Sequence, residues 1–389
     1  MLKSHPIFEH RRIFAPGPTP VPEEVLGELA RAPLHHRTKE FIGLFDRVRQ
    51  RLQFVFQTTQ PTYLLSSSGT GAMETCIVNL FSTGDEILVL NAGKFGERWE
   101  KIGTCYGMKV HSLKFEWGQA ADPEGVRGFL RAHGNIRGVF FQASETSTGV
   151  AHPVEAIAKV VRAESDALVI VDAITALGVS DLPLDRWDLD AVVSGSQKAF
   201  MLPPGLAFLA LSARAHDRRK IAGVPRFYFD LNAEDRALAG GESAWTPAVG
   251  LIMALDRVLA GMEAAGLPAI FAHHKRLAEG TRRGVSAMGL ELFAKKNPSD
   301  AVTAIHVPAG VEGKKIVSHL RDTFGITIAG GQDQWKGKMF RLAHLGFFDS
   351  LDMLTVLGAV EMTLKALGHP IHLGKGVAAA QTFFLEENT

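Results

Sequence analysis

Two ionisable side chains follow apolar runs that have the character of buried strands. Asp172 closes the run Leu168–Val171, and Lys198 comes shortly after the run Ala191–Ser194. Runs that are apolar on both faces are typical of parallel strands covered by helices. Ligands bind where the carboxyl ends of such strands meet, and one helix-containing crossover fits between the two residues. We therefore expect both side chains at the same edge of neighbouring strands.

Burial would give both groups unusual acid–base properties. A carboxylate among apolar residues is poorly solvated and needs a cationic partner. An amine that loses its water has a lowered pKa, and the unprotonated amine can attack a carbonyl carbon. Each residue alone also has an ordinary explanation, since Asp172 could cap the following segment and Lys198 could be a solvated surface charge.

The segment Ser66–Gly71, with the sequence SSSGTG, lies between an apolar run and a helical pattern. Small residues let the backbone approach an anion, a helix N-terminus offers free N–H groups, and the Ser68 and Thr70 hydroxyls add donors. A phosphate cradle is one interpretation, and a serine-capped helix with a flexible turn is the other. The GxGxxG motif is incomplete because Glu74 stands at its third glycine, and the P-loop motif is absent.

Two further loops end strands at the same predicted edge. Phe95 lies between glycines and could stack on a flat ring, and Ser144–Gly149 offers hydroxyl groups. Taken singly, they are a core aromatic and a polar loop. A phosphate cradle, an aromatic plate, a carboxylate and a lysine together are what pyridoxal phosphate requires. In this interpretation Asp172 keeps the pyridine nitrogen protonated and Lys198 bonds to the aldehyde carbon of the cofactor.

The lysine loop is the most specific motif of the chain. Ser194–Ala199 (SGSQKA) and Pro203–Gly205 (PPG) resemble the SGSQKxxxxPPG loop of the class V aminotransferases of PLP fold type I, especially the alanine–glyoxylate/serine–pyruvate aminotransferase group. Val171–Ala173 is similar to that family's pyridinium aspartate segment, and Glu145–Gly149 resembles its ExSTG loop. The likeness extends from about residue 14 to about residue 368.

The resemblance implies a role for each residue of the site. Lys198 and Asp172 would be catalytic, and Arg341 would bind the substrate carboxylate, which its planar guanidinium matches. The residues that it places at the cofactor are Ser68, Gly69, Thr70, Phe95, Thr146, Asp172, Gln197, Lys198, Ser243 and Thr246. Thr146 would touch the ring or its phenolic oxygen, Gln197 would border the phosphate, and Phe95 stands where tryptophan is common.

Several expectations about assembly and activity follow from the same resemblance. Ser243 and Thr246 would reach the cofactor of a neighbouring subunit, so a homodimer with shared active sites is expected, and His36 and Arg37 would line the entrance. The implied reaction moves an amino group from a small amino acid, alanine or serine, to a 2-oxo acid, glyoxylate or pyruvate. The alternatives are a lyase or desulfurase of the same fold, and a non-catalytic subunit on this scaffold.

The elements that must hold these residues alternate between short apolar runs and helical patterns, as in an α/β protein. Strands are expected at 63–65, 86–90, 138–142, 167–171, 191–194 and 206–211, with helices at 72–81, 99–107 and 153–163. With the resemblance, this predicts a large domain with a mostly parallel seven-stranded sheet flanked by helices and a smaller C-terminal α+β domain. The predicted bounds are an N-terminal segment at 1–20, a large PLP-binding domain at 21–255 and a small domain at 256–389.

Composition narrows the class of protein further. The 389 residues are 46% hydrophobic and 21% charged with a net charge of +1, which disfavours a disordered chain and a dedicated nucleic-acid binder. Two cysteines without CxxC spacing favour a reducing, cytoplasmic setting. No signal peptide, membrane span or metal-ligand spacing is predicted.

Overall fold

We describe residues 10–386 of a computed structural model, so the first nine residues of the predicted N-terminal segment lie outside the described part. A seven-stranded sheet forms its centre, in the order β2-β10-β9-β8-β5-β3-β4. β10 runs antiparallel to both of its neighbours and the remaining pairs are parallel, which confirms the predicted sheet. Its strands are β2 (Thr62–Leu65), β3 (Glu86–Asn91), β4 (Lys109–Lys114), β5 (Ile136–Gln142), β8 (Leu168–Asp172), β9 (Ala191–Gly195) and β10 (Ala207–Leu211).

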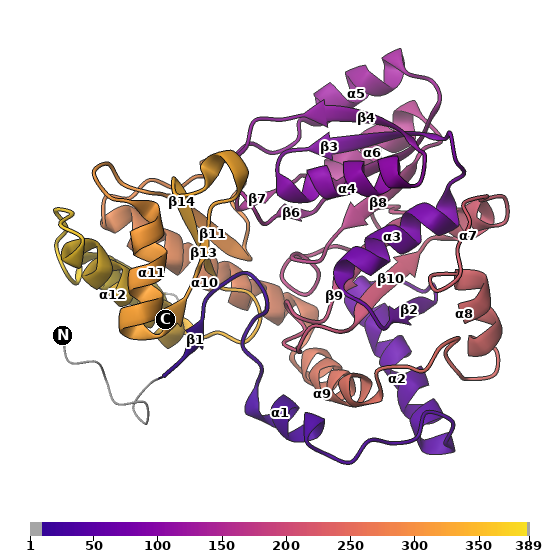
Figure 1. Ribbon diagram of the computed structural model, residues 1–389, viewed down its shortest axis with the longest axis horizontal. Coiled ribbons are helices and arrows are strands. Elements are labelled where there is room, and N and C mark those ends of the chain that lie inside the picture. Colours follow the sequence, from indigo (N-terminus) through magenta and orange to yellow (C-terminus); the bar gives the residue numbers. More distant parts are fainter. Residues whose placement is uncertain (1–9, 387–389) are drawn as a thin grey trace.

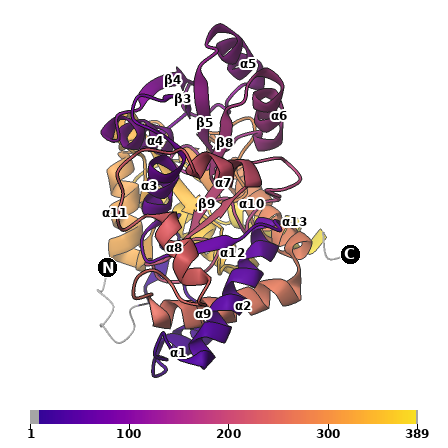
Figure 2. The same ribbon diagram turned by 90° about the vertical axis from the view of Figure 1, so that its right-hand side faces the viewer.

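Helices cover both faces of this sheet (Figures 1 and 2). One face packs its alternate residues, Phe140 and Ile170 among them, against α3 (Gly69–Leu80) and α4 (Lys94–Cys105). The other face packs Phe141 and Val171 against a second group of helices. That group is α2 (Lys39–Phe56), α5 (Pro123–Ala132), α6 (Val154–Glu164) and α9 (Val249–Ala265). α7 (Ala213–Arg219) and α8 (Leu231–Leu238) flank the β10 side.

The C-terminal part has a core of its own around a three-stranded sheet, β11-β14-β13. The strands of this sheet are β11 (Val302–His306), β13 (Ala329–Gly330) and β14 (Met339–Ala343). The C-terminal part also contains the short strand β12 (Ile326–Thr327) and the short helix η2 (Asp333–Trp335). Its helices are α10 (Leu267–Ala287), α11 (Gly313–Phe324), α12 (Ser350–Ala366) and α13 (Lys375–Glu386). The predicted domain boundary at 255/256 falls inside α9, a single continuous helix, and remains a prediction.

The N-terminal segment joins the two parts of the molecule. β1 (Arg12–Ile13) pairs with β12, and Phe14 stacks on Phe348 in the C-terminal core. The chain then crosses to the large sheet, where α1 (Glu23–Leu29) lies against α9 (Figure 1). We call the crossing residues, Pro16–Thr19, the strap. The hairpin of β6 (Ser144–Glu145) and β7 (Val150–Ala151) lies on the same side of the sheet as the strap.

Three local predictions were wrong, and some elements were not predicted. Residues 173–190, between β8 and β9, form turns with no helix. α3 begins at Gly69 and α4 at Lys94, three and five residues earlier than expected, so the supposed loop residues belong to first helical turns. β4 was missed because it is a half-exposed edge strand with mostly polar residues, and α13, the last helix of the described chain, was also not predicted. Within residues 10–386, no helix is long and apolar enough to cross a membrane.

Candidate active site

The structure brings Asp172 and Lys198 to the same edge of the central sheet. β8 and β9 are parallel neighbours in which Asp172 pairs with Val193, and Lys198 follows the end of β9. One carboxylate oxygen, Asp172 Oδ1, accepts a hydrogen bond of 2.9 Å from the backbone N–H of Ile174. Lys198 Nζ donates to the carbonyl oxygen of Pro16 in the strap. Each of the two side chains is thus held by a backbone group, one of the turn after β8 and one of the strap.

Desolvation moves the pKa values of both groups toward neutrality. Burial raises the pKa of Asp172 to about 6, although the Ile174 N–H and the charges of Arg98 and Lys198 favour its ionised form. Burial lowers the pKa of Lys198 to about 8, and the charge of Asp172 opposes that change. An amine with such a pKa can act as a base or nucleophile near neutral pH.

The glycine-rich segment is the N-terminus of α3. Ser68 is the N-cap residue, and its side chain makes no capping hydrogen bond, so it leaves backbone donors for an anion. Gln197 lies beside this turn: a Cβ on Gly195 would lie 3.1 Å from Gln197 Oε1 and 3.4 Å from the backbone nitrogen of Gly69. Gln197 Oε1 is also buried without a hydrogen-bond partner. The uncapped N-terminus of α3 suits a phosphate group, whereas Gln197 could donate to it only through its amide NH2.

Phe95 lies in the first turn of α4, near the α3 turn. Arg98, one helical turn further, places its guanidinium carbon 4.8 Å from the centroid of the Phe95 ring. The same guanidinium donates a hydrogen bond of 3.1 Å to Thr70 Oγ1. Arg98 therefore connects the aromatic ring with the α3 turn and adds positive charge beside Asp172. Sequence reasoning missed it, although its spacing of three residues from Phe95 was a usable signal.

Arg341 lies on β14, the central strand of the small sheet, and is 6% exposed. Its Nη1 donates to the Thr146 carbonyl oxygen at 2.9 Å, and its Nε and Nη2 donate to the Gly330 carbonyl oxygen at 3.3 and 2.8 Å. Burial lowers the pKa of Arg341 to about 10, and the charge of Glu145 opposes this. Thr146 Oγ1 shares a hydrogen bond of 2.7 Å with Thr175 Oγ1. A fixed guanidinium with remaining N–H groups suits a carboxylate.

The strap is the second feature that sequence reasoning did not assign to the site. Thr19 Oγ1 donates to the Lys198 carbonyl oxygen at 2.9 Å, and the Thr19 N–H donates to the Gln197 carbonyl oxygen at 3.2 Å. Gly17 has φ +147°, and a Cβ there would lie 2.5 Å from Lys198 Nζ. Only glycine fits this close approach. The signal was the segment PGPTP at 16–20.

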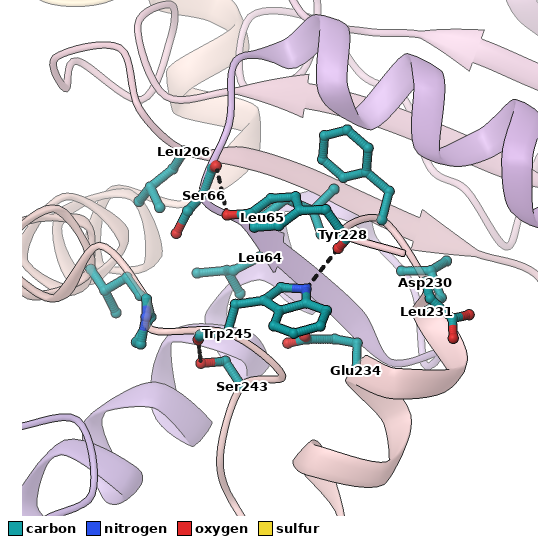
Figure 3. A pocket seen from close by; sticks show the side chains of 13 residues that line it. Leu64, Leu65, Ser66, Leu206, Tyr228, Asp230, Leu231, Glu234, Ser243 and Trp245 are labelled. Carbon is teal, nitrogen blue, oxygen red and sulfur yellow. Dashed lines mark hydrogen bonds between the residues drawn. The ribbon is translucent and has the colours of Figure 1, made fainter. Parts of the chain in front are cut away.

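Ser243 and Thr246 lie apart from this group within the chain. Ser243 Oγ donates to the Trp245 carbonyl oxygen at 2.7 Å, beside a small pocket that also contains Ser66 and Tyr228 (Figure 3). Thr246 is exposed.

The two predicted entrance residues lie on the loop before α2. The ring of His36 stacks on that of His35 with 4.6 Å between centroids, and Arg37 is exposed. Across residues 10–386, no group of three His, Cys, Asp or Glu side chains could hold a metal ion.

The chain is similar to known proteins in both sequence and structure. A model of the family described as aminotransferase class-V matches residues 14–346. The chain is 43% identical to the "Soluble hydrogenase 42 kDa subunit" of Anabaena cylindrica, over 96% of this chain and 98% of that one. It is 37% identical to the L-aspartate–glyoxylate aminotransferase of Paracoccus denitrificans, over 96% of each. The solved ureidoglycine–glyoxylate aminotransferase of Bacillus subtilis superposes with a TM-score of 0.93 at 28% identity, covering 97% of this chain and 98% of that one.

Proposed function

The chain belongs to the class V aminotransferase family and is a pyridoxal-phosphate-dependent aminotransferase, and we propose that it moves the amino group of alanine or serine to glyoxylate or pyruvate. The observation that carries this proposal is the meeting of Lys198, Asp172 and Arg341. The desolvated amine of Lys198 lies within electrostatic reach of both the buried carboxylate of Asp172 and the fixed guanidinium of Arg341. Amino acids and 2-oxo acids both present a carboxylate to such a site.

We propose the following arrangement of cofactor contacts. Bound pyridoxal phosphate supplies an electron-withdrawing ring that stabilises negative charge on the carbon bearing the amino group. Lys198 would hold its aldehyde carbon, Asp172 its pyridine nitrogen, and Phe95 one face of its ring. The phosphate contacts would come from Ser68, Gly69, Thr70 and Gln197, and Thr146 would contact the ring or its phenolic oxygen. The α3 N-terminus supports this fit, because its first backbone N–H groups are left free of any side-chain cap.

Three side chains would perform the chemistry. Lys198 Nζ, whose pKa burial lowers to about 8, would serve as the base that takes the proton from the substrate Cα and as the acid that returns it. Asp172 remains ionised above pH 6 and keeps the ring nitrogen protonated. Arg341 orients the substrate through its carboxylate, so that the Cα–H bond faces Lys198. The Pro16 carbonyl oxygen of the strap accepts a hydrogen bond from the Lys198 amine and would hold it in place.

The preference for a small neutral donor rests on the cations near the site. Arg341 serves the carboxylate common to all amino acids, while Arg98 is engaged by Thr70 and by the Phe95 ring. Lys94 is paired with Asp333 at 2.6 Å and with Glu97 at 3.0 Å. A second substrate carboxylate would have to displace one of these partners. Gly17 against Lys198 also limits the room for a large side chain.

The decisive experiment is a donor and acceptor panel followed through the cofactor's absorption. Purified protein should be yellow, and alanine or serine should convert the bound cofactor to its amine form, which glyoxylate or pyruvate should reverse. Lys198→Ala should lose the cofactor's characteristic band. A colourless protein that ignores added pyridoxal phosphate would refute the role of Lys198. Faster conversion by aspartate than by alanine or serine would refute the substrate preference and favour the reaction named for the Paracoccus relative.

The desulfurase alternative is weaker because it needs a reactive thiolate. Cys76 is fully buried, and burial raises the pKa of its thiol, while Cys105 lies exposed at the end of α4. A hydrogenase role is not proposed from the name of the Anabaena relative, because lysine, carboxylate and guanidinium are groups for amino transfer. The half-reaction also separates the classes, since a lyase does not leave the cofactor as its amine.

We also propose a homodimer in which Ser243 and Thr246 reach the partner's cofactor. The aromatic cluster of Phe227, Tyr228 and Trp245 supports this, because Phe227 is 78% and Tyr228 45% exposed beside the Figure 3 pocket. Mixing Lys198→Ala chains with chains altered at Ser243 and Thr246 should restore activity, because one of the two sites in a hybrid dimer is then intact. A monomer that holds the cofactor would contradict the proposal, as would mixtures without recovered activity.

A further inference from the structure

Glu145 is a fully buried carboxylate that receives four hydrogen bonds, two on each oxygen. Oε2 accepts from the backbone N–H groups of Phe95 and Gly96 at 3.1 and 3.2 Å. Oε1 accepts from the backbone N–H of Ser147 at 3.1 Å and from its hydroxyl at 2.5 Å. Both lone-pair regions of the carboxylate are therefore occupied by donors, which is the arrangement that an ionised buried carboxylate requires.

These contacts form the N-terminal cap of α4. Its N-cap residue is Gly93, which has no side chain with which to cap, so Phe95 and Gly96 are the second and third helical residues. The backbone N–H of Lys94, the first helical residue, donates to Ser147 Oγ at 3.0 Å. The first three orphan donors of α4 are thus satisfied by a hairpin fifty residues away in the chain. A negative charge at this place is also favoured by the helix dipole.

The packing around the cap leaves little freedom. A Cβ on Gly93 would lie 2.5 Å from Ser147 Oγ and 2.6 Å from Glu145 Cδ, so the N-cap backbone is in direct contact with the carboxylate side chain. The position of the helix start is consequently determined by Glu145 and Ser147, not by residues of the helix itself.

The same hairpin supports the substrate side of the site. Thr146, between the two capping residues, accepts the Arg341 Nη1 hydrogen bond at its carbonyl oxygen. The charge of Glu145 also favours the charged form of Arg341. One short turn therefore makes contact both with the helix that carries Phe95 and with the guanidinium of Arg341.

We propose that Glu145 is a positioning residue that fixes the Phe95 ring and Arg341 relative to each other. This inference rests on the proposed function, in which the ring contacts the cofactor and Arg341 binds substrate. The carboxylate acts through backbone N–H groups and through Thr146, without touching either ligand. Loss of the Glu145 charge would make both the Phe95 ring and the Arg341 guanidinium less firmly positioned.

Glu145→Gln tests the proposal with a change of almost no volume. The amide NH2 must face either the Phe95 and Gly96 donors or the Ser147 donors, so one pair of hydrogen bonds is lost wherever it points. The matched control is Glu361→Gln, because Glu361 is also buried and accepts from Gly374 and Gly376 N–H groups, both at 2.6 Å, at the start of α13. Both variants lose the same kind of capping carboxylate, but only one lies at the site.

Three readouts are measured for both variants. In protein without cofactor, hydrogen exchange at residues 95 and 96 should accelerate by about tenfold to a hundredfold in Glu145→Gln and remain unchanged in Glu361→Gln. In protein with cofactor, the dissociation constant of pyridoxal phosphate should rise by a similar factor in Glu145→Gln, so that binding is weaker. The circular dichroism of the bound cofactor should decrease. KM for the amino donor should rise with the same variant. Ser147→Ala, which keeps the carboxylate, should shift all three readouts less and in the same direction.

Two results would overturn the proposal: unchanged cofactor affinity and dichroism in Glu145→Gln, or equal losses in Glu361→Gln. If Glu145→Gln fails to fold, Ser147→Ala decides, and an unchanged exchange rate at residue 94, whose N–H donates to Ser147 Oγ, then refutes the capping role of the hairpin. If the unaltered protein ignores pyridoxal phosphate, the proposed function fails, whereas the exchange measurement without cofactor still tests the cap.

Discussion

Gly17→Ala is the sharpest test of how the strap is built. The added Cβ would lie 2.5, 2.7 and 2.9 Å from Lys198 Nζ, Cε and Cδ, so the strap or the lysine must move by about 1 Å to restore ordinary contact distances. The residue must also keep φ at +147°, which alanine rarely adopts. Overpacking of this kind costs about 1–3 kcal/mol. Because the moved atom is the amine itself, a shift of about 1 Å should lower kcat by about a hundredfold.

The assay pairs a melting curve with the single-turnover conversion of the bound cofactor by alanine. Gly84→Ala is the matched control, since Gly84 has φ +92° and open space where its Cβ would lie. We expect both variants to lose stability, and only Gly17→Ala to slow the conversion. If Gly17→Ala turns over as fast as Gly84→Ala, the strap does not touch the working lysine and the reasoning about its close approach is wrong.

Three further predictions concern charge and access. Burial raises the pKa of Asp172 from 3.8 to about 6. Between these two pH values the folded chain holds a proton on Asp172 that the unfolded chain has released. The free energy of unfolding therefore falls as the pH rises through this range. In protein without cofactor, the ionised Asp172 carboxylate therefore lowers the free energy of unfolding by roughly 3 kcal/mol. Asp172→Asn should raise the melting temperature at neutral pH. This gain should disappear below about pH 4, where Asp172 is protonated in both states. Arg341→Lys, which loses the planar fork, should raise KM for amino acids and oxo acids by about tenfold to a hundredfold. A thiol reagent should modify Cys105 rapidly and Cys76 only on unfolding, since Cys105 is exposed and Cys76 fully buried.

Each of these has a contrary outcome. An Asp172→Asn protein that melts lower without cofactor at neutral pH would mean that the carboxylate is well solvated. An unchanged KM in Arg341→Lys would mean that the substrate carboxylate binds to a group other than Arg341. Two rapidly reacting thiols in the native protein would contradict the packing of α3 against the sheet.

The common sheet edge of Asp172 and Lys198 could be predicted because its evidence is local. Leu168–Val171 is apolar throughout, and a charged residue at the end of such a run has few places to lie other than the sheet edge. The start of α4 could not be found this way, because Gly93 carries no cap and the capping group is Glu145 in another hairpin. The residue that caps α4 thus lies fifty positions along the chain from the helix that it caps.

Other parts depend on long-range contacts that no local pattern reveals. The 173–190 connection lacks the expected helix because its residues pack as buried turns around Ala173 and Leu177. Arg98 was passed over because a guanidinium on a helix is usually a surface group, and only the meeting of α3 and α4 gives it partners. Ser243 and Thr246 concern a subunit interface, which one chain's pattern does not describe.

The pairing of β1 with β12 also sets when the N-terminal segment can attach to the C-terminal part during synthesis. Arg12 leaves the ribosome early, but its partner Ile326 is made only near the end of the chain. At about 5–20 residues per second, the first strand waits tens of seconds for that partner, while the large sheet already has all seven of its strands. Closing so long a loop is also entropically costly. The contacts of the strap with Gln197 and Lys198 can form before this, whereas the β1–β12 pairing that attaches the strap to the C-terminal part has to form late.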